Sequence, residues 1–96
     1  VFESDGLTFE SCSLTAPSFT YQNTPVSVLK TIGVTNLKLS NNTINGGGTS
    51  IEISYTAQFP NSNIEIVNND LINAEDYGLL ASVIDTMIFS NNNVQP

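Results

Sequence analysis

Apolar and polar residues alternate in four segments of the chain, which cover residues 6–14, 36–44, 63–71 and 86–94. The segments align without gaps, and within each one apolar side chains recur at every second position, the period of a β-strand. Three aligned columns hold only apolar residues: Leu7, Leu37, Ile64 and Met87; Phe9, Leu39, Ile66 and Phe89; Leu14, Ile44, Leu71 and Val94. Agreement in so many columns indicates an internal repeat.

The repeat has no fixed length, because its first column recurs after 30, 27 and 23 residues. A second alternating segment follows in each complete unit, at 26–28, 51–53 and 79–81. No apolar stripe with the 3.6-residue period of a helix occurs. We therefore expect an all-β fold with little or no helix, in which about four coils stack and each strand pairs with its equivalent about 4.8 Å away, as in a β-solenoid.

A polar bend interrupts each segment. It is Ser11-Cys12 in the first segment and Asn-Asn in the others, at 41–42, 68–69 and 91–92. Asparagine tolerates the left-handed backbone of a sharp turn, and its amide can bond to the amide of the next coil as a ladder. Either residue of each pair could form this ladder. We favour the second, which gives a structural column of Cys12, Asn42, Asn69 and Asn92.

From residue 6 to residue 94, the pattern apolar-x-apolar-x-Asn-Asn-x-apolar resembles the right-handed parallel β-helix of the pectate-lyase-like superfamily. The resemblance implies a right-handed coil. It also implies an extracellular setting among polysaccharide lyases and hydrolases, phage tailspike depolymerases, adhesins and structural spacers. Homotrimers, common among tailspike β-helices, are an expectation from the resemblance alone.

Residues 1–96 are interpreted as a single β-helix segment of a longer solenoid. The first kernel begins at Gly6 and the last residue, Pro96, follows the fourth kernel closely, with no amphipathic helix at either end. Solenoids need polar caps on their terminal coils. We therefore expect flanking coils or neighbouring chains to cap the ends.

The amino-acid composition limits the classes of ligand and partner that the chain can bind. The chain has no histidine, no arginine, two lysines and a net charge of −7, which argues against His-dependent catalysis and against nucleic-acid binding through phosphates. No apolar run approaches the roughly 20 residues of a membrane span. Ser, Thr and Asn make up about a third of the residues, which is typical of an extracellular or surface-exposed repetitive β protein. The negative charge favours neutral glycans, or acidic ones bridged by calcium.

Candidate catalytic residues are sparse. No outward column of the expected coils holds two carboxylates, the pair that glycoside hydrolysis requires. Lys38, Glu65 and Asp70 are the weak catalytic candidates, and Lys38 and Glu65 are expected to form a surface ion pair. No cofactor is expected. The adjacent acids Glu75 and Asp76 are weak candidates for a calcium site, because calcium prefers oxygen ligands.

Aromatic rings in the loops are the remaining sign of a glycan surface, and Tyr55 and Phe59 are the candidates. The leading hypothesis is a structural and carbohydrate-interacting β-helix segment of an extracellular, adhesin-like, surface or tailspike-like protein. The alternative is part of a polysaccharide lyase or glycoside hydrolase whose catalytic residues lie partly outside this chain. The absence of catalytic bases and the absence of paired acids both favour the first hypothesis.

Overall fold

The computed structural model describes residues 5–16, 20–21, 24–25, 27–55, 60–82 and 84–95. All regular secondary structure in these ranges is β-strand, and they contain no helix. They therefore include no helix that is long and apolar enough to cross a membrane. The prediction of an all-β chain is confirmed for the described residues.

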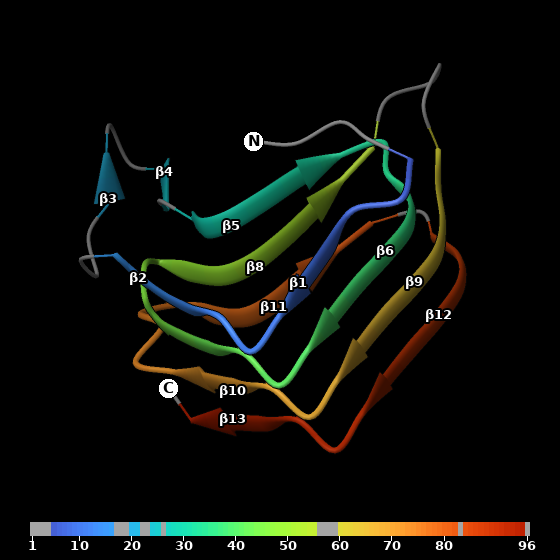
Figure 1. The fold of residues 1–96 in the computed structure, drawn as a ribbon. Helices are drawn as coiled ribbons and strands as arrows, with labels where there is room; N and C mark the ends of the chain where they lie inside the picture. Colours follow the sequence, from blue (N-terminus) through green and yellow to red (C-terminus); the bar gives the residue numbers. More distant parts are fainter. Residues whose placement is uncertain are drawn as a thin grey trace.

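Three parallel sheets account for eleven of the strands, and the chain passes through them in rotation (Figure 1). The first sheet has the order β1-β6-β9-β12, the second β2-β7-β10-β13 and the third β5-β8-β11. A short antiparallel hairpin of β3 and β4 lies between β2 and β5 in the sequence. The bounds are β1 Thr8–Glu10, β2 Ser13–Ala16, β3 Thr20–Tyr21, β4 Thr24–Pro25, β5 Ser27–Ile32, β6 Thr35–Ser40, β7 Thr43–Gly46, β8 Thr49–Ser54, β9 Asn61–Val67, β10 Asp70–Ile72, β11 Tyr77–Ala81, β12 Ile84–Ser90 and β13 Asn93–Gln95.

The strand register aligns the four sequence segments with one another. In the first sheet, Phe9, Leu39, Ile66 and Phe89 lie opposite each other in order. In the second sheet, Leu14, Ile44, Leu71 and Val94 do the same. Equivalent side chains therefore stack on one another through the molecule, and this regular parallel stacking is compatible with the predicted β-solenoid.

The predicted start of the third sheet is wrong by three residues. Residues 26–28 were expected opposite 51–53, but the structure places Leu29, Lys30 and Thr31 there. Residues 79–81 are aligned with 51–53 as predicted. The reason is Thr31, a polar residue whose side chain is fully buried, so that residues 29–31 do not show the apolar alternation of the other two segments. Residue 26 lies outside the described residues.

The core lies between the three sheets and consists of inward-facing aliphatic side chains. Its buried members are Leu29, Val34, Leu37, Leu39, Ile44, Ile51, Ile53, Ile64, Ile66 and Leu71. All of them belong to β5–β10 or to the turn before β6. Burial of this kind is worth about 1.5–3 kcal/mol for each large aliphatic side chain. The middle of the stack therefore supplies most of the hydrophobic stabilisation.

Gly46 ends β7 at a corner where only glycine fits. Its φ is +95°, in the left-handed region that side chains disfavour. A Cβ at this position would overlap the carbonyl oxygen of Ala16 on the neighbouring strand. The same carbonyl accepts a hydrogen bond from the Gly47 N–H at 3.1 Å. The glycine run at 46–48 thus allows close approach of two backbones.

Candidate functional site

Each bend between the first and second sheets is made by two residues with different tasks. The first residue has a left-handed backbone, with φ between 55° and 58° at Ser11, Asn41, Asn68 and Asn91. Asparagine adopts this conformation more readily than most residues, which accounts for its recurrence there. The second residue of each bend faces inward and is buried or half-buried.

The second residues form a hydrogen-bonded column of Cys12, Asn42, Asn69 and Asn92. In each step, the backbone N–H of one residue donates to the side-chain oxygen of the next: Cys12 to Asn42 at 2.8 Å, Asn42 to Asn69 at 2.9 Å and Asn69 to Asn92 at 2.9 Å. Each side-chain Nδ2 in turn donates to a backbone carbonyl of the preceding unit, on Phe9, Leu39 and Ile66. Every amide therefore satisfies the backbone of the unit before its own.

The bonds differ in kind from those expected of a ladder. The sequence suggested bonds between side-chain amides, but the regular contacts join side chains to backbone. Within the column one amide–amide bond is present, from Asn69 Nδ2 to Asn92 Oδ1 at 3.0 Å. Two others lie outside it, from Asn63 Nδ2 to Asn36 Oδ1 at 2.6 Å and from Asn73 Nδ2 to Asn45 Oδ1 at 2.8 Å. Buried backbone groups are costly to leave unpaired. The main role of the column is therefore to pair the backbone groups of the bends.

Asn61 performs a similar task at another corner, and the repeat pattern of the sequence does not mark it. Its side chain is almost completely buried. Its Oδ1 accepts from the Val34 N–H at 2.9 Å, and its Nδ2 donates to the carbonyls of Ser54 and Ser82 at 3.0 and 3.1 Å. No column of asparagines marks this position, because Ile84 is its neighbour in the register. A repeat-based search therefore passes over it.

The outward surface of the second sheet, called here the polar face, is nearly free of charge. Its eight positions belong to two aligned columns on β2, β7, β10 and β13. Six of them hold hydroxyl or amide groups, one holds a carboxylate and one is apolar: Ser13, Thr15, Thr43, Asn45, Asn93 and Gln95, then Asp70 and Ile72. Five of the eight are exposed and the others are half-buried. This face offers hydrogen-bonding groups at strand spacing, about 4.8 Å apart between neighbours.

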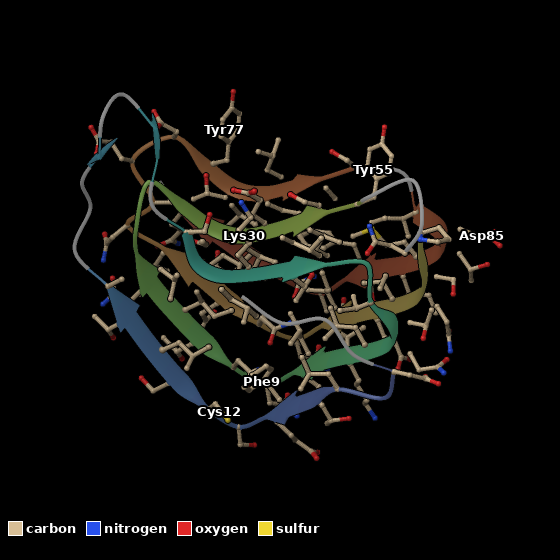
Figure 2. All side chains as sticks on the ribbon, turned by 90° about the horizontal axis from the view of Figure 1, so that it is seen from above. Phe9, Cys12, Lys30, Tyr55, Tyr77 and Asp85 are labelled. Atoms are coloured by element: carbon tan, nitrogen blue, oxygen red, sulfur yellow. The ribbon has the colours of Figure 1, made fainter. Side chains whose placement is uncertain are left out.

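The third sheet carries a compact charged cluster on its outward side. Lys30 Nζ lies 3.0 Å from Glu52 Oε2, and the hydroxyls of Ser27 and Ser54 each donate to the same carboxylate at 2.9 Å. Lys30 points from β5 toward β8 (Figure 2). With three donors the carboxylate is well satisfied, which indicates a structural ion pair.

Burial acts to raise the pKa of Glu52, but the hydrogen bonds from Lys30, Ser27 and Ser54 and the charge of Lys30 outweigh it. The net effect holds the pKa of Glu52 below the ordinary value of a glutamate. Its carboxylate is therefore ionised at neutral pH. A proton donor in glycoside hydrolysis needs the opposite shift, so Glu52 is poorly suited to that role.

The three weak catalytic candidates do not form a cluster. Lys38 and Glu65 are neighbours in the first sheet, as their alignment predicted. The expected ion pair between them is wrong: in the described part of the chain the ion pair is Lys30 with Glu52. The three-residue shift of β5 sets Lys30 opposite Glu52 and leaves the alignment of Lys38 with Glu65 unchanged. Asp70 lies apart from both, on the polar face of the second sheet.

Glu75 and Asp76 lie exposed in the connection from β10 to β11. Their backbone N–H groups donate to the carbonyls of Gly47 and Gly48 at 3.0 and 2.8 Å, which fixes this connection against the preceding unit. Within the described residues, no three acids or cysteines come together in a group that could hold a metal ion. The two acids thus supply only part of the oxygen shell that calcium takes.

Two tyrosine rings are exposed near the third sheet. Tyr55 follows the end of β8 and is 49% exposed, and Tyr77 begins β11 and is 52% exposed. Figure 2 shows both rings pointing away from the ribbon, toward the same side of the view. Phe59, the other predicted glycan contact, lies outside the described residues. Tyr77 was not among the predicted contacts, and its exposed ring stands at the first position of β11.

Comparisons of the chain with models of protein families, with curated proteins and with solved structures found no match.

Proposed function

We propose that the chain is a segment of a right-handed parallel β-helix with about four coils, of the pectate-lyase-like kind, and that it serves as a structural, glycan-binding part of an extracellular, cell-surface or virion-surface protein. The rotation of the chain through three parallel sheets and the inward asparagine column support the β-helical part of the proposal. The glycan-binding part depends on the outward surfaces.

The polar face is the observation that carries the glycan-binding proposal. Hydroxyl and amide side chains exchange hydrogen bonds with sugar hydroxyls without a need for charge. On this face they stand in two columns whose backbone is fixed by strand pairing, so little backbone entropy is lost when they bind. The net charge of −7 disfavours acidic polymers, so neutral polysaccharides are the proposed ligands.

Exposed Tyr55 is the proposed second contact, because a flat ring can stack on the face of a sugar. It lies beyond the third sheet, whereas the polar face covers the second. The two sites can therefore be tested separately. Flanking coils or neighbouring chains are proposed to cover the ends of the stack, and a homotrimer is one such arrangement.

The experiment is retention of the purified chain on a panel of neutral and acidic polysaccharides, with and without calcium, while new reducing or unsaturated ends are monitored. We expect binding to neutral polymers without cleavage. Thr43→Glu, which sets a second charge beside Asp70 on the polar face, should reduce retention at least tenfold. Ile88→Glu, which adds the same charge to the first sheet, is the matched control and should bind normally.

Tyr55→Ala and Tyr77→Ala form a second matched pair, because the two rings are equally exposed. Loss of retention in the first variant alone would support the stacking contact at Tyr55. New chain ends would overturn the non-enzymatic proposal and direct attention to Lys38, Glu65 and Asp70. A folded chain that binds no polysaccharide would reduce the proposal to its structural part.

A further inference from the structure

Exposed apolar side chains gather at one end of the stack. The strands β11, β12 and β13 each close their sheet on the same side and are called here the downstream edge (Figure 1). Six large apolar side chains are exposed in the described part of the chain, and five lie on this edge: Tyr77, Leu80, Ile88, Phe89 and Val94. At the opposite end, Leu7, Phe9 and Leu14 are half-buried and pack on the core, as Leu79, Ile84 and Met87 do on the downstream edge.

Two of the five belong to core columns. Phe89 is 40% exposed, whereas Ile66 in the same column is fully buried. Val94 is 45% exposed, whereas Leu71 beside it is fully buried. Nothing in their position on the strand differs, since both face inward. They are exposed because the described structure places no strand beyond them.

The hydrogen bonds show the same incompleteness. The N–H groups of Cys12, Asn42 and Asn69 each donate to the asparagine of the following unit. The N–H of Asn92 has no such partner among the described residues. In the same series, Nδ2 groups bind the carbonyls of Phe9, Leu39 and Ile66, and the next carbonyl in register is that of Phe89.

We propose that the downstream edge binds a polypeptide segment from outside these 96 residues, in parallel strand pairing, with an asparagine at its bend. The segment has the form apolar-x-apolar-x-x-Asn-x-apolar. Its apolar residues cover Met87, Phe89 and Val94. Its asparagine oxygen accepts from the Asn92 N–H, and its amide nitrogen donates to the Phe89 carbonyl. The proposal rests on the β-helical part of the proposed function, in which flanking coils or neighbouring chains cover the ends, and it specifies what covers this end; it does not depend on glycan binding.

Addition of a strand to an open sheet edge is a known mode of peptide recognition, in which main-chain bonds give affinity and side-chain pockets give specificity. Here the specificity comes from two features that must coincide, a matching apolar spacing and an amide at the bend. An aliphatic residue at the bend would cover the edge but leave the Asn92 N–H buried without an acceptor, which is costly.

A second copy of this chain is a poor occupant. If it stacked in register on the downstream edge, Cys12 would lie next to Asn92, as the residue that begins the column. A thiol is only a weak hydrogen-bond acceptor and cannot replace both groups of the amide. Each copy also carries a net charge of −7, so two copies repel one another.

The test uses the 96-residue chain and a labelled synthetic peptide of residues 61–73, which contains the required pattern. Glu65→Gln and Asp70→Asn in the peptide remove its negative charges. Its matched control carries Asn69→Leu in addition. Binding is followed by fluorescence anisotropy, and light scattering measures the size of the chain. We expect the asparagine peptide to bind at least tenfold more tightly than the leucine peptide.

Two variants of the chain locate the binding. Phe89→Glu puts a charge into the proposed contact and should abolish peptide binding. Ile88→Glu adds the same charge to the outward side of the same strand and should leave binding within about twofold. Circular dichroism establishes that both variants are folded. The glycan assay on the same samples separates this proposal from the glycan-binding part of the proposed function, since peptide binding and glycan retention use different surfaces.

Equal affinity for the two peptides would overturn the role of the asparagine. Binding that survives Phe89→Glu would place the peptide elsewhere, and no binding to the folded chain would reject the proposal. Dimers or larger assemblies that Phe89→Glu dissociates would identify a second copy as the occupant, against the proposal.

Discussion

Two units of this stack have nearly the same sequence pattern but differ in how many neighbouring units they pack against. The unit of β9 and β10 has a neighbour on each side, and its column residues Ile66, Asn69 and Leu71 are buried. The unit of β12 and β13 has a neighbour on one side only, and Phe89, Asn92 and Val94 are exposed or half-buried. The comparison shows that in a repeat protein the contribution of a residue depends on its unit's neighbours as much as on its own chemistry.

Substitutions of core residues should give the largest difference in stability between the two units. Ile66→Ala removes a fully buried side chain and should cost about 2–5 kcal/mol of unfolding free energy. Phe89→Ala removes a larger side chain that already contacts water, so we expect about 1–2 kcal/mol. Urea denaturation of both variants measures the difference. If both cost the same, the downstream edge is covered in solution, and the comparison fails.

The bend asparagines should differ less. Asn69→Leu leaves the Asn42 N–H and the Leu39 carbonyl without partners in a buried bend, and we expect a loss of about 1–3 kcal/mol. Asn92→Leu breaks the equivalent bonds at a half-buried position, where water can replace them, so the loss should be below about 1 kcal/mol. Thermal unfolding of both variants tests this order. An unchanged midpoint for Asn69→Leu would contradict the role assigned to the column.

The smallest expected effect on stability concerns one outward column of the third sheet, whose residues change from charged to apolar toward the downstream edge. Lys30, Glu52 and Leu80 are aligned across the third sheet, so the charged pair lies between the first two strands and an apolar residue lies on the edge. Because the pKa of Glu52 is lowered on folding, its stabilisation is fully present above the unfolded pKa of about 4.3 and is lost as the pH falls through the lower folded value.

Glu52→Gln should therefore lower stability at neutral pH and reduce the loss on acidification. Chemical denaturation at several pH values between 7 and 3 measures both effects. Glu65→Gln is the control at neutral pH, since Glu65 takes part in no ion pair within the described residues, and its effect should stay within about 0.5 kcal/mol. If Glu52→Gln is as stable as the parent at pH 7, the favourable free energy of the ion pair only balances the cost of removing its charges from water.

Much of the architecture could be predicted because each repeated column has one dominant chemistry. Strand alternation and the recurrent bends were sufficient to align β6, β9 and β12. The register of β5 could not be found in this way, because Thr31 is buried although it is polar, and the true partner of Glu52 was missed with it.

Asn61 was missed for a related reason. It performs its task once, between Val34 and Ile84, so no column of like residues marks it. The surface was the least predictable part. Outward side chains are under weak packing constraint, and their chemistry becomes visible only when the register sets them side by side, as on the polar face.

Every asparagine side chain of the column bonds to the backbone of the unit before its own, so the bends are satisfied in order from the N-terminus to the C-terminus, which is the order of protein synthesis. A ribosome releases the N-terminal units first. Each unit then waits for the asparagine of the next one before its own bend is satisfied. The stack can thus grow by addition of one unit at a time at its C-terminal end. The most recently synthesised unit is then the one whose exposed edge can still pair with a wrong partner.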